Sequence, residues 1–142
     1  MAQPNPIEIA TRALEHRDRS RREIDDRLVR AGVEDEARVE ALAELERAGY
    51  IDDARFAGLR ARELAGRGYG DEYIRFDLVG HRVPPDDVAE AIAGLEPETE
   101  RAAALVARLG RTRKTGATLA RKGFETDAIQ SALGTDVADT AG

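Results

Sequence analysis

Two adjacent carboxylates, Asp52 and Asp53, lie in the stretch GYIDDARF, which spans Gly49 to Phe56. Paired carboxylates can bind a metal ion or act as general acid and base, so this stretch is the first place to look for chemistry. Neighbouring side chains on a helix point about 100° apart, however, and do not converge on one atom. We therefore interpret the stretch as a structural joint, in which Asp52 caps a new helix and Tyr50 and Ile51 pack across the junction. The joint comprises Gly49, Tyr50, Ile51, Asp52, Asp53 and Phe56.

No other set of residues has the types and spacing of a catalytic or metal site. The chain contains no cysteine, which excludes thiolate zinc sites and cysteine nucleophiles, and its two histidines, His16 and His81, cannot form a multi-histidine site. The sequence RGYG, Arg67 to Gly70, lacks the glycine spacing and the lysine of a phosphate-binding loop, so we interpret it as a helix break with Tyr69 packed inward. We expect no catalytic residue, no metal and no cofactor, and therefore a protein that is not an enzyme.

Arginines are the remaining candidates for recognition, because a guanidinium group can bind carboxylates of a protein partner or phosphates of DNA. Most arginines on helix surfaces are solvated or paired with acids of the same chain, which is the alternative for each of them. The candidates for partner contact in the middle of the chain are Arg60, Arg62, Arg67, Tyr69 and Arg75.

The most basic short run of the chain, RTRK, is the best candidate for contacts with DNA phosphates. Its basic residues are Arg111, Arg113 and Lys114, and the alternative is that they form the solvated start of a helix. Basic residues at a helix N-terminus oppose the helix dipole, a cost that a negatively charged partner would offset.

The elements that position these residues are predicted to be helices. Alanine, leucine, arginine and glutamate dominate the 142 residues, aromatic residues make up only 4%, and tryptophan is absent. The formal net charge is −6, and no third of the chain is strongly basic. Because phosphate neutralisation supplies most of the affinity of DNA-binding proteins, tight independent DNA binding is disfavoured. With no long apolar run and no signal-peptide pattern, we expect a cytoplasmic protein that does not enter a membrane.

Three segments of the chain resemble one another and indicate a repeated unit. The segments Ser20 to Val33, Gly70 to Val83 and Arg111 to Phe124 align without a gap, and each has leucine at the same place. We predict an all-α tandem array of three three-helix units, elongated or curved, because units of this size must pack on their neighbours. The predicted units are residues 1–50, 51–95 and a shortened 96–135, followed by a flexible tail at 136–142.

Capping residues mark where the helices of each unit begin and end. Ser20 and Glu23 have the pattern of a capping box at the start of a second helix. Gly32 and Gly123 are predicted to end the second helices of the first and third units in the left-handed conformation. Arg82 stands at the equivalent place in the second unit, so we expect that helix to end differently.

The sequence of the second unit resembles the signature of the RecX family, regulatory proteins of the bacterial RecA recombinase. The run AGYIDDARFA is followed by RARELAGRGYGDEYIRFDL, which matches the family's GY-[IL]-DD-x-RFA run and its later RGYG and I-R-x-[ED]-L phrases in order. The likeness extends from SRREI in the first unit to RKGFETDAI in the third. The resemblance implies tandem three-helix units, in agreement with the periodicity.

The resemblance also implies a function, which neither composition nor periodicity indicates. A RecX-like protein would bind the helical groove of the RecA-DNA filament, contact more than one protomer and limit filament growth. The ATPase, strand-exchange and co-protease activities of RecA would then fall, while ATP and Mg²⁺ stay with the recombinase. We expect a monomer that contacts DNA weakly or through the filament. The alternative is a stand-alone DNA-binding module of the helix-turn-helix kind, although the helix DEYIRFDLVGH lacks the basic character of a recognition helix.

Overall fold

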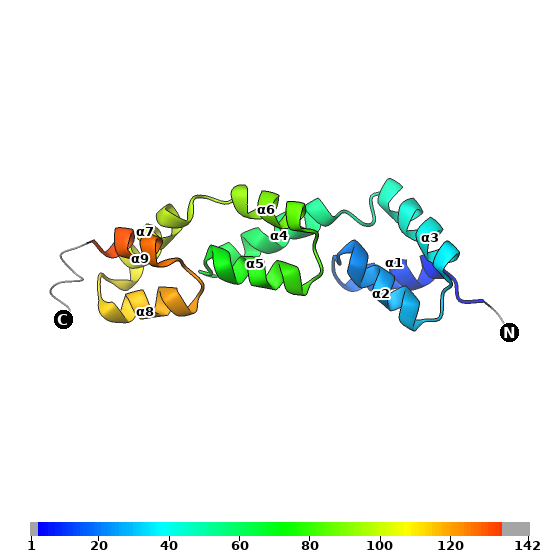
Figure 1. Ribbon diagram of the computed structural model, residues 1–142, viewed down its shortest axis with the longest axis horizontal. Helices are drawn as coiled ribbons and strands as arrows, with labels where there is room; N and C mark the ends of the chain where they lie inside the picture. Colours follow the sequence, from blue (N-terminus) through cyan, green and yellow to red (C-terminus); the bar gives the residue numbers. More distant parts are fainter. Residues whose placement is uncertain (1–2, 135–142) are drawn as a thin grey trace.

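The computed structural model describes residues 3–134, and all regular secondary structure in this part of the chain is helical. The helices follow one another along a long axis, from α1 at one end to α8 and α9 at the other (Figure 1). The expected all-α, elongated architecture is confirmed. Within residues 3–134, no helix is long and apolar enough to span a bilayer. The helices are α1 (Pro6–His16), α2 (Arg21–Arg30), α3 (Asp35–Arg47), α4 (Asp53–Gly66), α5 (Asp71–Gly80), α6 (Pro85–Ala93), α7 (Glu98–Leu109), α8 (Arg113–Arg121) and α9 (Thr126–Leu133).

Each set of three successive helices encloses its own hydrophobic cluster, so we name α1–α3, α4–α6 and α7–α9 the first, second and third units. Equivalent leucines of the second helices, Leu28, Leu78 and Leu119, belong to the three clusters and are 0% exposed. Ile51 packs in the first cluster, although the sequence boundary assigned it to the second unit. The predicted unit boundaries stay predictions, and the tail predicted at 136–142 lies outside the described residues.

Side chains cap helices where the sequence predicts caps. Before α2, the Glu23 N–H donates to Ser20 Oγ and the Ser20 N–H donates to Glu23 Oε1, each at 3.1 Å, which completes the predicted capping box. Asp52 caps α4 by accepting a hydrogen bond from the Arg55 N–H (3.0 Å). Such caps satisfy N–H groups that have no partner within the helix.

All three second helices end in the same way, which corrects the expectation for Arg82. Gly32, Gly123 and Arg82 have φ angles of 82°, 92° and 65°, all in the left-handed region. In each unit, this residue and the next one donate to carbonyls in the last turn of the helix. The left-handed conformation costs an arginine about 1–2 kcal/mol. The Arg82 side chain also makes an ion pair with Asp26 of the first unit (3.0 Å).

The second helices of the three units lie end to end along one side of the molecule (Figure 1). The N-terminus of α2 meets the C-terminus of α5, where Ser20 Oγ donates to the His81 carbonyl (2.6 Å). The N-terminus of α5 meets the C-terminus of α8 in the same way, and the Gly70 N–H donates to the Lys122 carbonyl (2.8 Å). The units therefore meet at two equivalent places, which we name the first interface and the second interface.

Candidate functional site

The structural joint predicted at Gly49 to Phe56 connects α3 to α4. Gly49 follows α3 in the left-handed region, with a φ angle of 83°. Ile51 is buried in the first cluster and Phe56 in the second, so these two side chains anchor the segment to both units. Tyr50, also expected to pack across the junction, is 53% exposed.

The two adjacent carboxylates face different partners and cap different helices. Asp52 accepts from the N–H of Arg55 in its own unit, whereas Asp53 accepts from the N–H of Arg21 at the start of α2 (2.7 Å). Burial raises the pKa of Asp53 above its ordinary value, and the bond from Arg21 partly opposes this shift. Among residues 3–134, no group of three or more His, Cys, Asp or Glu side chains could hold a metal ion. Each carboxylate accepts a hydrogen bond from a backbone N–H in the first turn of a helix.

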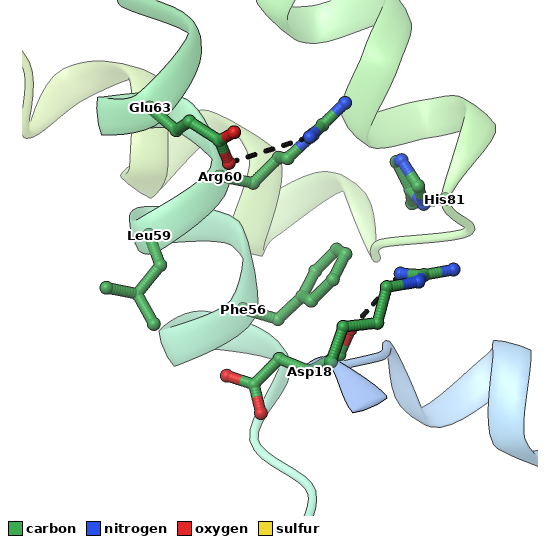
Figure 2. A pocket seen from close by; sticks show the side chains of 7 residues that line it. Asp18, Phe56, Leu59, Arg60, Glu63 and His81 are labelled. Carbon is green, nitrogen blue, oxygen red and sulfur yellow. Dashed lines mark hydrogen bonds and ion pairs between the residues drawn. The ribbon is translucent and has the colours of Figure 1, made fainter. Parts of the chain in front are cut away.

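Arg60 of α4 binds Asp77 of α5 through two hydrogen bonds, donated by Nε and Nη2 and each 2.8 Å long. Figure 2 shows Arg60, Phe56 and His81 around one pocket, whose volume is about 170 Å³ and which lies at the first interface. The bidentate pair uses much of the hydrogen-bonding capacity of the guanidinium within the chain. Arg60 is therefore a weaker candidate for partner contact than the sequence indicates.

The ion pair between Arg60 and Asp77 makes the stability of the fold depend on pH. Hydrogen bonds from Arg60 hold the pKa of Asp77 below its ordinary value. A carboxyl with a lowered pKa stabilises the fold above its unfolded-state pKa of about 3.9, and this contribution is lost as pH falls through the folded-state value. We expect Asp77→Asn to lower the free energy of unfolding by about 1–3 kcal/mol at neutral pH. Urea titrations at a series of pH values should show the difference from wild type shrinking below about pH 4.

Glu72→Gln is the matched control for this prediction. Glu72 makes an ion pair with Arg75 (2.6 Å), but its side chain is 63% exposed. Exposed pairs of this kind contribute little, so the control should change the free energy of unfolding by less than about 1 kcal/mol. Equal losses in the two variants would contradict the importance given to the pair between Arg60 and Asp77.

The other candidate arginines of the second unit are exposed but do not form one patch. Arg62 of α4 lines a shallow hollow together with acidic residues of α6. Arg75 pairs with an exposed glutamate one turn away in α5, and the ion pair of Arg67 with a glutamate of α4 is long, at 3.8 Å. The structure thus places Arg60 and Arg62 against different helices and leaves Arg67 and Arg75 with exposed ion-pair partners.

Tyr69 lies at the second interface. Its ring stacks on Tyr73 with the centroids 4.0 Å apart, and Nζ of Lys122 lies 4.4 Å from the same ring. Its carbonyl accepts from Arg101 of α7 (3.1 Å). Gly68, with a φ angle of 88°, provides the helix break predicted for RGYG. These contacts make Tyr69 a residue that positions the third unit against the second.

The basic run before and within α8 is partly used inside the chain. Arg111 donates from Nε and Nη2 to the Leu133 carbonyl, at 2.9 and 2.7 Å, and so caps the end of α9. Arg113 and Lys114 are exposed in the first turn of α8. Every charged residue from 111 to 124 is basic, although the chain as a whole is acidic. Among the described helices, α8 therefore has the highest net positive charge.

An exposed apolar face on α5 was not among the sites predicted from the sequence. Phe76 is 78% exposed and Val79 is 59% exposed, and both lie outside the face that buries Ile74 and Leu78. A hollow of about 530 Å³ between α5 and α6 is lined almost entirely by apolar side chains, with Arg75 at its edge. Helical spacing could have identified Phe76, because it is two positions from each buried residue and therefore points about 160° away from both.

The chain resembles curated proteins named regulatory protein RecX along nearly its whole length. The relative from Xanthomonas axonopodis pv. citri (strain 306) is 34% identical over 144 residues, which cover 94% of this chain and 89% of the relative. The relative from Stenotrophomonas maltophilia (strain R551-3) is 36% identical over 144 residues, which cover 94% of this chain and 88% of the relative. No protein-family model matches the chain.

Two crystal structures share the fold. The structure of RecX from Lactobacillus salivarius has a TM-score of 0.79 and 19% identity, covering 90% of this chain and 92% of that one. A second structure, of regulatory protein RecX, has a TM-score of 0.70 and 20% identity, covering 95% of this chain and 73% of that one. At these identities the likeness establishes the helical architecture.

Proposed function

The chain belongs to the RecX family, and from this we propose that it regulates the RecA recombinase by binding the RecA-DNA filament. Binding limits filament assembly and lowers the ATPase, strand-exchange and co-protease activities of RecA in DNA repair and recombination. The protein acts as a cytoplasmic monomer, without catalysis, metal or cofactor of its own. The observation that carries the proposal is the likeness to RecX proteins along 94% of the chain.

The elongated shape of the molecule is suited to a partner that is itself extended. Arrays of small helical units present long surfaces that suit partners longer than one unit. The row formed by α2, α5 and α8 has exposed side chains on every unit, including Val29, Phe76 and Arg113. A surface of this kind can contact more than one protomer of a filament.

We assign the partner contacts to the second unit and the phosphate contacts to the third. Arg67 and Arg75 have only exposed ion-pair partners, and Phe76, the residue after Arg75 in α5, offers apolar surface in the same unit. An exposed ion pair contributes little to the stability of the free chain. Replacing it with a contact to a protein partner therefore costs little free energy. Arg113 and Lys114 are exposed at the start of the most basic helix, where phosphates of DNA inside the filament would find positive charge.

The double variant Arg67→Glu with Arg75→Glu is expected to bind RecA filaments about tenfold more weakly than the wild type, a loss of about 1.4 kcal/mol. Reversing two exposed charges removes favourable contacts with the partner and introduces repulsion, while the fold loses two exposed ion pairs and the contact of the Arg67 guanidinium with the Tyr69 ring, 5.8 Å from its centroid. Fluorescence anisotropy of the labelled protein, titrated with filaments assembled on single-stranded DNA, measures the change.

Arg12→Glu with Arg47→Glu is the control, because it makes the same charge change at exposed positions of the first unit. We expect it to bind filaments nearly as the wild type does. If both double variants lost the same affinity, a general charge effect would explain the result and the assignment to the second unit would be wrong.

DNA binding without RecA distinguishes filament regulation from a stand-alone DNA-binding module. The chain has a net charge of −6, and only α8 and its flanks are purely basic, so few phosphates can be neutralised. We expect weak binding with a shallow dependence on salt. Tight binding with a steep salt dependence, abolished by Lys114→Glu, would contradict the proposed function and favour the module.

A further inference from the structure

The second interface is built from backbone contacts. The Gly70 N–H donates to the Lys122 carbonyl (2.8 Å), and the Glu72 N–H donates to the Gly123 carbonyl (3.1 Å). A Cβ added at Gly70 would lie 2.5 Å from backbone atoms of Gly123, and a Cβ added at Gly123 would lie 2.6 Å from the Tyr73 nitrogen. The two backbones therefore touch directly, and contacts of this kind do not depend on ionic strength.

Partly buried polar groups also stabilise the second interface. Glu98, the first residue of α7, accepts from the Asp71 N–H at the start of α5 (2.6 Å). Arg101 of α7 pairs with the carboxylate of Asp71, and the two side chains are only 10% and 23% exposed. Salt screens such sheltered pairs much less than exposed ones. The second and third units are thus fixed to each other.

The first interface occupies the equivalent place but is made by side chains. Ser20 Oγ takes the role that a backbone N–H has at the second interface. Arg82 pairs with Asp26 (3.0 Å) and Arg55 with Asp18 (3.5 Å), and these four side chains are 34–48% exposed. Exposed ion pairs of this kind are weak and are screened by salt, whereas the hydrogen bond from the Arg21 N–H to Asp53 (2.7 Å) and the contact of His81 with Glu23 (3.1 Å) are partly buried and are screened less. Among the described residues, no hydrogen bond between two backbone groups crosses the first interface.

The covalent link at the first interface joins two units that are anchored separately. Only residues 48–52 separate α3 from α4. Ile51 anchors the link in the first cluster, and Phe56 anchors the start of α4 in the second cluster. Two separate cores thus meet through a segment whose remaining contacts are polar.

We propose that the first interface is a hinge sensitive to ionic strength, on which the first unit swings relative to a rigid body formed by the second and third units. The hinge changes the curvature of the array without unfolding any unit, because each unit keeps its own cluster. It is a property of the free protein and holds whichever partner the protein binds. In a complex, it would let the first unit adapt to the pitch of an extended partner.

Spin-label distances test the hinge in the whole chain, because the absence of cysteine allows labels to be placed freely. The exposed pair Glu40→Cys and Glu90→Cys spans the first interface, and the pair Glu90→Cys and Arg108→Cys spans the second. Double electron-electron resonance is recorded at ionic strengths of about 0.01 M and about 1 M, which shorten the Debye length from about 30 Å to about 3 Å.

We expect the distance distribution across the first interface to broaden or shift at high salt, while the distribution across the second stays narrow and unchanged. The double variant Asp18→Asn with Asp26→Asn, which removes two charges and keeps the side-chain size, should produce the high-salt distribution at low salt. Two distributions that are both unaffected by salt, or that broaden equally, would overturn the proposal. So would a double variant that behaves like the wild type at low salt.

Discussion

Leu78→Ala is expected to lower the free energy of unfolding of the second unit by about 2–5 kcal/mol, the range for removing a large buried side chain. Leu78 is 0% exposed and lies in the cluster enclosed by α4, α5 and α6. A three-helix unit has few residues with which to close the resulting cavity, so little relaxation is available. Because both neighbouring units contact the second one, its loss should also release the two interfaces.

Urea titration followed by circular dichroism measures this change, and hydrogen exchange with mass spectrometry identifies the helices that lose protection. Val79→Ala is the control, because Val79 is the adjacent residue and is 59% exposed. A surface substitution of this kind should change the free energy of unfolding by no more than about 0.5 kcal/mol. Similar losses in the two variants would contradict the separate core assigned to the second unit.

Gly70→Ala is expected to destabilise the second interface by about 1–3 kcal/mol, a typical cost of forcing extra atoms into a packed contact. Gly70 has a φ angle of −88°, which alanine adopts without strain, so the backbone conformation alone predicts no loss. The added Cβ would lie 2.5 Å from backbone atoms of Gly123 and Phe124, and a backbone cannot rotate away as a side chain can. The two units must therefore separate to accommodate it.

Gly80→Ala provides the matched control within the same helix. Gly80 is the last residue of α5, and a Cβ added there meets nothing within 4 Å. Alanine in a helix is favoured over glycine by about 0.5–1 kcal/mol, so this variant should be neutral or slightly stabilised. Thermal unfolding and the spin-label distance across the second interface measure both variants. A Gly70→Ala protein with wild-type stability and an unchanged distance would contradict the direct backbone contact.

The positions of the helices could be predicted from the sequence because the residues that repeat from unit to unit are the buried ones. Ile24 and Ile74, like Leu28 and Leu78, occur at the same places in two units and are all 0% exposed. Their spacing reports only which face of a helix is buried, and this is a local property. Caps such as Ser20 are equally local, since donor and acceptor lie within three residues.

Contacts between distant segments could not be predicted in the same way. Gly70 is needed because Gly123 lies against it, and no local pattern connects these residues. Arg82 adopts the left-handed conformation although it is not a glycine, and its ion-pair partner Asp26 is 56 residues away. Whether Arg60 is free to contact a partner likewise depends on how α4 crosses α5, which the periodicity of the sequence does not determine.

The rate of single-stranded-DNA-dependent ATP hydrolysis by the cognate RecA, measured while this protein is titrated, tests the central claim most directly. Regulation of the filament predicts that the rate falls when the protein is well below one copy per recombinase, because one regulator that limits filament assembly affects many protomers. The same titration with the Arg67→Glu and Arg75→Glu variant should require more protein for the same fall. An unchanged rate with folded wild-type protein in stoichiometric excess would contradict the regulation of RecA proposed for this chain.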